Sequence, residues 1–160
     1  MDRRLFLLGA LALAGCASSG PATLRPNTTL YILRHGDRDG ENLSDRGRAR
    51  ARALVGALAD DPVDAIHSPG IQRNLDTAAP LAAARGLTVQ RRPQENPGTR
   101  LAAEAAGRSV VWVGNKGNLQ AIWDTLSLPG DPPLDYGQLF VVRSGSDGAV
   151  TVERRFFGPQ

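Results

Sequence analysis

The sequence predicts an α/β fold, a three-layer α/β/α sandwich with a mostly parallel sheet and a C-terminal antiparallel hairpin. Two observations predict it. From residue 29 onward, short β-branched or apolar runs alternate with helical segments, the pattern of a parallel sheet covered on both faces. Near the end, two strand-like runs are separated only by residues 145–148, which is typical of a hairpin. A chain of 160 residues suffices for one such domain.

Each predicted strand is a short apolar run, and each predicted helix has apolar residues at helical spacing. The strands are expected at 29–33, 64–67, 87–90, 109–113, 138–143 and 149–154. The helices are expected at 45–59, 70–85, 100–106 and 118–126. Ser44 is placed to cap the first helix, while Gly86 and Gly107 are placed to end the second and third.

The composition favours a small anionic ligand over nucleic acid or a metal ion. Lys116 is the only lysine among 19 basic residues, so nearly all cations are arginines, whose planar fork suits phosphate. A GC-rich coding sequence would raise arginine and alanine together and is an equally good explanation of this excess. Acidic residues are scattered among the basic ones, so nucleic-acid binding is not expected. The single cysteine and two histidines lack metal-ligand spacing, and we expect neither metal nor cofactor.

The first fifteen residues have the pattern of a bacterial export signal. Two arginines precede a short apolar stretch, and Leu13-Ala14-Gly15-Cys16 resembles a lipobox, whose cysteine is lipidated and becomes the mature N-terminus. We therefore expect a lipoprotein signal peptide at 1–15, lipidation of Cys16, a tether at 16–28 and the domain at 29–160. The protein would be exported and anchored to a membrane, facing the periplasm. The paired arginines leave twin-arginine and Sec export both open.

Three loops follow the carboxyl ends of predicted strands, where ligands bind in open α/β sheets. They are Arg34–Asp39, His67–Arg73 and Gly114–Asn118. The first opens with Arg34-His35-Gly36, and the second contains Ser68-Pro69 and Arg73, followed by Thr77-Ala78. In this order and in these contexts, the motifs resemble those of the histidine phosphatase superfamily, the phosphoglycerate-mutase-like group.

The resemblance extends over about residues 29–158 and implies a phosphatase that uses no metal. His35 would be the nucleophile and would form a phosphohistidine that water then cleaves. Arg34 and Arg73 would bind the phosphate oxygens, where their fixed forks suit the charge of the transition state. Gly36 would let the loop approach the phosphate without a Cβ clash.

The chain departs from this family at one position. The family usually has a second histidine after a later strand, but here Asn115 follows Val113-Gly114. Asparagine donates a hydrogen bond to substrate without ever becoming cationic. Lys116 would supply the missing positive charge only if its side chain turned toward the phosphate site. His67 lies at the end of another strand, and we expect it to be structural.

The general acid of the reaction is left open by the sequence. The family often places an acidic residue in the loop after the third strand, which makes Glu95 the first candidate. Asp37, next to the nucleophile, is the second candidate and also a possible substrate-binding residue. Each of these carboxylates is equally well explained as a solvated loop acid.

Two functions remain open at this point. The first is a phosphohydrolase of low activity that acts on a small phosphomonoester. The second is a catalytically degenerate lipoprotein that binds a phosphorylated or other anionic ligand. Retention of His35 with both arginines favours the first, whereas Asn115 favours the second.

Overall fold

Strands and helices alternate along the chain in the predicted order. The computed structural model describes residues 22–160. The strands of its main sheet are β1 (Thr28–Arg34), β4 (Ala65–Ser68), β5 (Val89–Arg91), β6 (Ser109–Gly114), β7 (Gln138–Ser144) and β8 (Val150–Phe156). The helices are α1 (Asp45–Ala57), α2 (Gln72–Arg85), α3 (Pro97–Glu104) and α4 (Lys116–Thr125). A small separate hairpin consists of β2 (Arg38–Asp39) and β3 (Asn42–Leu43).

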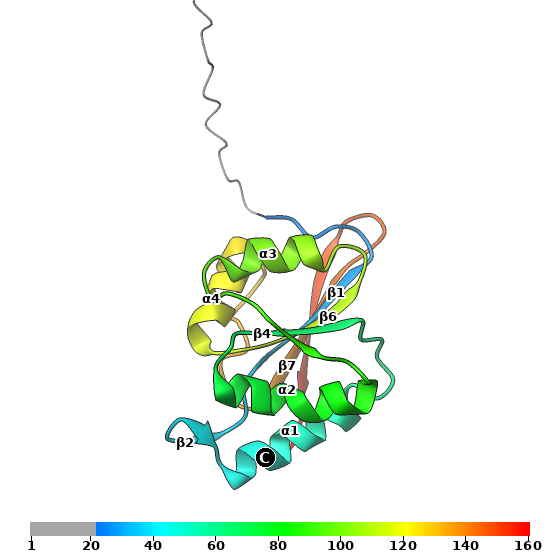
Figure 1. Cartoon of the computed structure of the whole chain (residues 1–160). Helices are drawn as coiled ribbons and strands as arrows, with labels where there is room; N and C mark the ends of the chain where they lie inside the picture. The colour runs from blue at the N-terminus through cyan, green and yellow to red at the C-terminus, as the bar shows by residue number, and fades with distance from the viewer. Residues whose placement is uncertain (1–21) are drawn as a thin grey trace, which may run out of the picture.

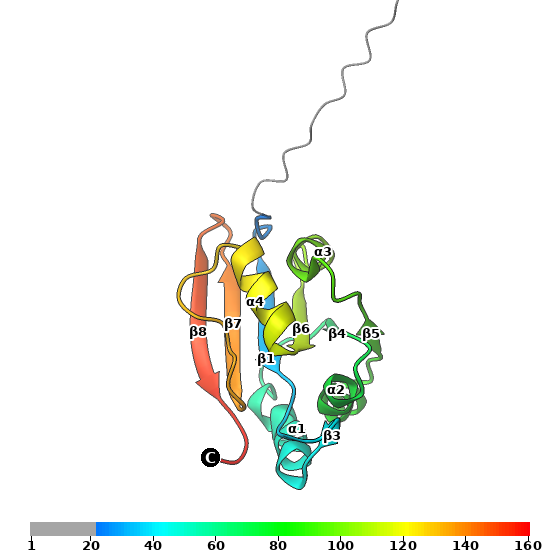
Figure 2. The same ribbon diagram turned by 90° about the vertical axis from the view of Figure 1, so that its left-hand side faces the viewer.

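The main sheet has six strands in the order β5-β4-β6-β1-β7-β8, which Figure 2 shows from right to left. The strands β5, β4, β6 and β1 pair in parallel. β7 pairs antiparallel with β1, and β8 antiparallel with β7. The predicted α/β fold, with a mostly parallel sheet and a C-terminal hairpin, is confirmed.

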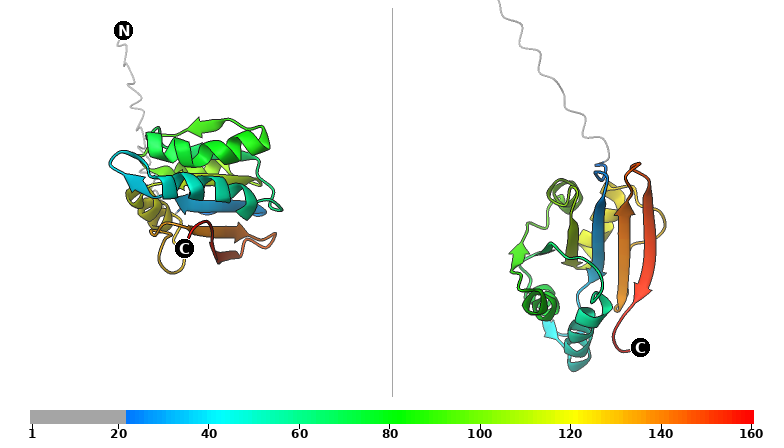
Figure 3. Two further views of the ribbon diagram at one scale, coloured as in Figure 1. Left: turned by 90° about the horizontal axis from the view of Figure 1, so that it is seen from below. Right: turned by 90° about the vertical axis from the view of Figure 1, so that its right-hand side faces the viewer.

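Each face of the sheet is covered by two helices, with an apolar core beneath each pair (Figure 1). Side chains alternate along β1, so Tyr31 and Leu33 pack beneath α1 and α2, whereas Leu30 and Ile32 pack beneath α3 and α4. Seen from below, α1 and α2 lie side by side across one face (Figure 3). The three-layer arrangement follows from this alternation.

Two local features differ from the expected elements. The segment expected to be a plain loop after β1 contains the hairpin β2–β3, which turns at Gly40 with a φ of 58°. α3 begins at Pro97, three residues earlier than expected, because proline is favoured in the first turn of a helix. Asn96 precedes it in a left-handed conformation, which asparagine tolerates better than most residues.

The predicted signal peptide and lipidated Cys16 lie outside the described residues. Between residues 22 and 160, no helix is both long and apolar enough to cross a bilayer. Within the same range, no cluster of three or more histidine, cysteine or acidic side chains is arranged to hold a metal ion.

Candidate functional site

The loops predicted to carry the site meet at one edge of the sheet. β6 lies between β1 and β4, so the carboxyl ends of these three parallel strands are neighbours. β1 leads into His35, β4 into the loop before Arg73, and β6 into Asn115. Residues far apart in the sequence are thereby brought to the same edge.

His35 is held rigidly at this edge and is only 2% exposed. Its backbone N–H donates to the carbonyl of Gly114 at 2.8 Å, which ties the end of β1 to the end of β6. Its Nδ1 lies 2.8 Å from the carbonyl oxygen of Gly36. Because a carbonyl only accepts hydrogen bonds, Nδ1 carries the proton and Nε2 has the lone pair that can accept a hydrogen bond.

The imidazole of His35 is neutral at neutral pH, because its pKa is lowered to about 4. Burial is the main cause, since it disfavours the charged ring. The hydrogen bond to Gly36 opposes this effect, while the charges of Arg34, Arg73 and Arg38 lower the pKa further. A neutral ring with an unprotonated Nε2 is the form that can attack phosphorus.

Arg73, in the first turn of α2, contacts the nucleophile candidate directly. Its Nε donates to Nε2 of His35 at 3.2 Å, and its Nη1 pairs with Glu41 of the β2–β3 hairpin at 2.9 Å. Nη2 lies on the same edge of the guanidinium as Nε and has no partner within residues 22–160. Thr77 fixes the helix here, since its hydroxyl accepts from the Gly36 N–H at 2.9 Å and donates to the Arg73 carbonyl at 2.8 Å.

Arg34 lies against the segment that precedes β7. Its Nη1 donates to the carbonyl of Leu134 at 3.0 Å and its Nη2 to the hydroxyl of Tyr136 at 3.1 Å. The guanidinium carbon stands 4.0 Å from the centre of the Tyr136 ring, within the range of a cation–π contact. The buried Nε of Arg34 has no partner among the described residues.

Tyr136 joins Arg34 to His35. The centroids of the Tyr136 and His35 rings are 5.8 Å apart, with the rings tilted by 57°. Arg73 therefore contacts His35 directly, whereas Arg34 contacts the Tyr136 ring, which in turn lies next to His35. Tyr136 was not predicted as a site residue, because a single tyrosine before a strand forms no motif. Its only signal in the sequence was that it lies within residues 29–158, over which the family resemblance extends.

Asn115 is the N-cap of α4 and takes part in a reciprocal cap with Asn118. Its Oδ1 accepts from the Asn118 N–H at 3.2 Å, and its own N–H donates to Asn118 Oδ1 at 3.1 Å. The Nδ2 of Asn115 points instead to Oε1 of Gln94 at 3.3 Å. Because Oδ1 caps the helix, the Nδ2 group of Asn115, which is the hydrogen-bond donor, faces away from the helix.

The two acidic candidates occupy different surroundings. Both carboxylate oxygens of Asp37 are engaged, one by Arg46 at 3.1 Å and the other by Arg50 at 2.7 Å. Burial alone would raise the pKa of Asp37, but the hydrogen bond and charge of Arg50 and the charge of Arg46 leave it below its usual value. Glu95 is exposed in the loop between β5 and α3, and no described residue pairs with it. Neither carboxylate has a described contact with His35.

Lys116 and His67 lie apart from the contacts around His35. Lys116 is exposed and borders a cleft that Asp131 and Asp135 also line. His67 is buried on β4, with its Nδ1 3.5 Å from a carboxylate oxygen of Glu104 on α3. Burial, together with nearby arginines, lowers the pKa of His67 to about 4, so this contact joins a carboxylate to a neutral ring.

Comparisons with known sequences match part of the chain. The model of the histidine phosphatase superfamily (branch 1) matches residues 30–94. The uncharacterized protein Rv0525 of Mycobacterium tuberculosis is 35% identical over 77 residues, which cover 41% of this chain and 38% of that relative. The chain thus spans about two fifths of the length of this curated relative.

Comparisons with solved structures extend over most of the chain. A mycobacterial glucosyl-3-phosphoglycerate phosphatase, Rv2419c, in complex with inorganic phosphate has a TM-score of 0.57 at 20% identity, covering 83% of this chain and 98% of its own. SixA of Agrobacterium tumefaciens, a candidate phosphohistidine phosphatase, has a TM-score of 0.62 at 20% identity, with coverage of 81% and 98%. These similarities establish the fold.

The sequence match supports the histidine phosphatase superfamily. The matched segment contains Arg34, His35 and Arg73, the residues that meet at the sheet edge, and ends before Asn115. The predicted departure at Asn115 lies in the part of the chain that the family model does not match.

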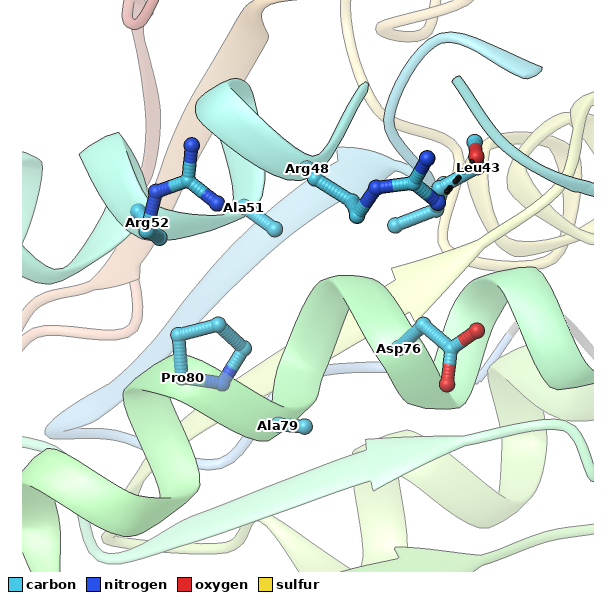
Figure 4. Close-up of a pocket in the computed structure, with 7 residues that line it drawn as sticks. All are labelled: Leu43, Arg48, Ala51, Arg52, Asp76, Ala79 and Pro80. Carbon is cyan, nitrogen blue, oxygen red and sulfur yellow. Dashed lines mark hydrogen bonds between the residues drawn. The ribbon is translucent and has the colours of Figure 1, made fainter. Parts of the chain in front are cut away.

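A separate cleft lies between α1 and α2 (Figure 4). It has a volume of about 350 Å³. Leu43, Ala51, Ala79 and Pro80 line it together with the polar side chains of Arg48, Arg52 and Asp76. Arg48 is fixed at its border by a hydrogen bond to the Leu43 carbonyl at 2.7 Å. None of the residues that contact His35 lines this cleft.

Proposed function

We propose that this domain hydrolyses phosphomonoesters through a phosphohistidine on His35. The observation that carries the proposal is the 3.2 Å hydrogen bond from Arg73 Nε to His35 Nε2, in a ring whose other nitrogen is bound to the Gly36 carbonyl. An unprotonated nitrogen thus faces an arginine, which is the environment an anionic electrophile requires. The match to the histidine phosphatase superfamily and the inorganic phosphate held by the mycobacterial neighbour support this reading.

In the first step, the lone pair of His35 Nε2 attacks phosphorus. The new P–N bond forms as the P–O bond to the alcohol breaks, and the leaving oxygen takes up a proton. Arg73 gives up its hydrogen bond to Nε2, and its Nε and Nη2 then donate to the phosphoryl oxygens as a fork. In the second step, water attacks phosphorus, the P–N bond breaks, and inorganic phosphate leaves a neutral His35.

Asn115 is proposed to donate its amide to the same phosphoryl group. Its Oδ1 is held by the N–H of Asn118, so Nδ2 is the end free to exchange Gln94 for a ligand oxygen. This donor is uncharged, so it adds no positive charge to stabilise the transferring phosphoryl group. Loss of a whole donor to a developing charge typically costs about 10²–10³ in rate, and we expect loss of the charge alone to cost part of that factor. We therefore propose slow turnover of a small phosphomonoester.

Hydrolysis of p-nitrophenyl phosphate by the purified chain tests this function. Wild type should turn over slowly and form an acid-labile phosphoenzyme, and His35→Ala should do neither. Asn115→His should raise kcat about 10²-fold, because it restores a cationic donor. His67→Gln, which alters the other histidine, should leave kcat unchanged. Turnover by His35→Ala at the wild-type rate would refute the mechanism.

The second candidate function is binding without turnover. It is favoured by the neutral Asn115 and by the ion pair that Glu41 makes with Arg73. In that case vanadate should raise the melting temperature of wild type, and Arg73→Ala should abolish the rise, while no phosphoenzyme forms. Catalysis fits the retained His35 geometry better, because simple anion binding needs no unprotonated imidazole.

Anchoring to a membrane through Cys16 is a further part of the proposal. It is supported by the Leu13-Ala14-Gly15-Cys16 tetrad and its basic flank. Cys16→Ser should abolish labelling by a radioactive fatty acid and release the protein from membranes. Retention of the variant in the membrane fraction would show that the anchor is not attached there.

A further inference from the structure

We propose that Tyr136 is the general acid of the reaction proposed above and gives its phenolic hydrogen to the leaving-group oxygen. The inference rests on the proposed function and adds a catalytic residue to it. It is drawn from the position of Tyr136, which touches both Arg34 and His35, and from the state of its hydroxyl group.

The reaction needs a proton donor that the acidic residues do not supply. Both oxygens of Asp37 are bound by Arg46 and Arg50. The carboxylate of Glu41 is bound to Arg73 by an ion pair, and its side chain is largely exposed. Glu95 is exposed and has no described contact with any residue around His35. Among residues 22–160, a donor next to the nucleophile must come from another kind of side chain.

Tyr136 is close enough to reach a phosphoryl group on His35. Its ring centroid is 5.8 Å from that of His35, and its half-buried side chain leaves it accessible to a ligand. The guanidinium carbon of Arg34 lies 4.0 Å from the centre of the same ring. A phosphoester bound between His35 and Arg34 would therefore lie against the tyrosine.

The hydroxyl of Tyr136 still has its hydrogen to donate. Arg34 Nη2 donates to the phenolic oxygen at 3.1 Å, so this contact engages a lone pair and not the O–H. No residue between 22 and 160 accepts the hydroxyl hydrogen. The adjacent guanidinium would also stabilise the phenolate that remains after proton transfer. A hydroxyl hydrogen beside the leaving oxygen is what the departure of a strongly basic alkoxide requires.

The backbone around Tyr136 is fixed to the loop that carries the nucleophile. Gly137 has a φ of 84°, and a Cβ there would lie 3.0 Å from the Phe157 carbonyl, so only glycine fits. The Phe157 N–H donates to the Gly137 carbonyl at 2.9 Å, and Arg50 donates to the Phe157 carbonyl at 2.7 Å. Arg50 in turn holds Asp37, two residues after His35.

The proton that Tyr136 gives up in the first step is replaced in the second step. As Nε2 of His35 attacks and the P–O bond breaks, the Tyr136 hydrogen moves to the departing alkoxide, which leaves as an alcohol. The tyrosine is then a phenolate. When water attacks the phosphohistidine, the phenolate takes a proton from that water and the P–N bond breaks. Both side chains return to their starting states.

Leaving-group dependence tests the proposal in the full chain. Tyr136→Phe keeps the ring beside Arg34 and His35 and removes only the hydroxyl. Phenyl phosphate has a basic leaving group that needs protonation, whereas 2,4-dinitrophenyl phosphate does not. In a single turnover, the variant should lose about 10²-fold in the rate of phosphoenzyme formation from phenyl phosphate and less than about twofold in that rate from the dinitrophenyl ester. Tyr31→Phe removes the chain's other tyrosine hydroxyl, which contacts Asp61 at 3.3 Å, and should alter neither rate.

Each outcome separates this inference from the function on which it rests. An equal loss on both esters would mean that Tyr136 only positions Arg34, and no loss on either would mean that it takes no part. Both results overturn the general-acid role and leave the phosphatase intact. Absence of turnover and of phosphoenzyme in wild type with both esters would overturn the phosphatase function, and this inference with it.

Discussion

The two ends of the Asn115 side chain have different partners, and this allows its structural and chemical roles to be separated. Oδ1 caps α4, while Nδ2 faces Gln94 and, by our proposal, the ligand. Aspartate caps a helix as well as asparagine and favours its N-terminus electrostatically, but it has no hydrogen to donate. A single substitution can therefore keep the cap and remove the donor.

Asn115→Asp should keep or raise the melting temperature and weaken vanadate binding by about 10–100-fold, because a hydrogen bond to a charged ligand is lost. Thermal unfolding with and without vanadate measures both quantities. Asn115→Ala is the matched control and should lose stability as well as affinity. Wild-type vanadate affinity in Asn115→Asp would show that the amide does not touch the ligand.

The residues of the candidate site differ in how far the sequence could predict them. Arg34-His35-Gly36 and Arg73 follow strands and form recognisable motifs, so their location at the sheet edge was predictable. The partners of Arg34 were not, because Leu134 and Tyr136 lie about a hundred residues away. A local motif carries no information on which distant residues a long side chain contacts in the folded protein.

At the level of elements, the first turn of α1 lies unusually close to the loop after β1. A Cβ on Gly36 would be 2.7 Å from the Gly47 carbonyl, and a Cβ on Gly47 would overlap the carbonyl of Asp37. These two glycines allow the helix to hold the His35 loop by direct backbone contact. Gly56, near the end of the same helix, faces open space.

Gly47→Ala should therefore destabilise the domain by about 1–3 kcal/mol through overpacking and displace the loop that holds His35. Gly56→Ala, in the same helix, should stabilise the domain by about 0.5–1 kcal/mol because alanine favours the helix. Urea unfolding of both variants measures the difference. Equal effects of the two substitutions would mean that the close contact at Gly47 has no energetic importance.

The β2–β3 hairpin places a carboxylate on the arginine that is proposed to bind phosphate. Glu41 is largely exposed, so its ion pair with Arg73 is worth at most about 1 kcal/mol. Glu41→Gln should tighten phosphate binding up to about fivefold at low salt, since a competing charge is removed. Asp39→Asn, in the same hairpin, is the control and should change affinity less. Weaker binding by Glu41→Gln would show that the carboxylate supports the site and does not compete.

At the scale of the whole molecule, two buried histidines make stability depend on pH. His35 and His67 both have a pKa of about 4 when folded, against an ordinary value of 6.5. Between these values the unfolded chain binds more protons than the folded chain, so the free energy of unfolding falls as the pH is lowered from 6.5 to 4. Asp37, whose pKa is below its usual 3.8, contributes only at lower pH.

The melting temperature should thus fall steadily from pH 6.5 to pH 4, with each histidine contributing on the order of 3 kcal/mol at the acid end. His67→Gln should reduce the slope by about half. Thermal unfolding at pH 7, 6, 5 and 4 measures it, and a flat profile would contradict the neutral buried rings. The rate of hydrolysis should also fall toward pH 4, as His35 becomes protonated.

The fold as a whole was more predictable from the sequence than its details. Buried parallel strands such as β1 and β6 are continuous apolar runs, which stand out in any sequence. The hairpin β2–β3 was missed because strands of only two residues are too short to show a periodicity. The start of α3 was predicted too late because Asn96 and Pro97 are residue types common in loops. In the structure the helix begins at Pro97.

The central position of β1 has a consequence for how the protein is made. This strand is synthesised first, yet its neighbours β6 and β7 begin only at Ser109 and Gln138. Until those segments leave the ribosome, the apolar run of β1 has no partner in the sheet. Pairings so distant in sequence form slowly, because a long loop must close first. The nascent chain therefore passes through a prolonged interval in which chaperones can bind it.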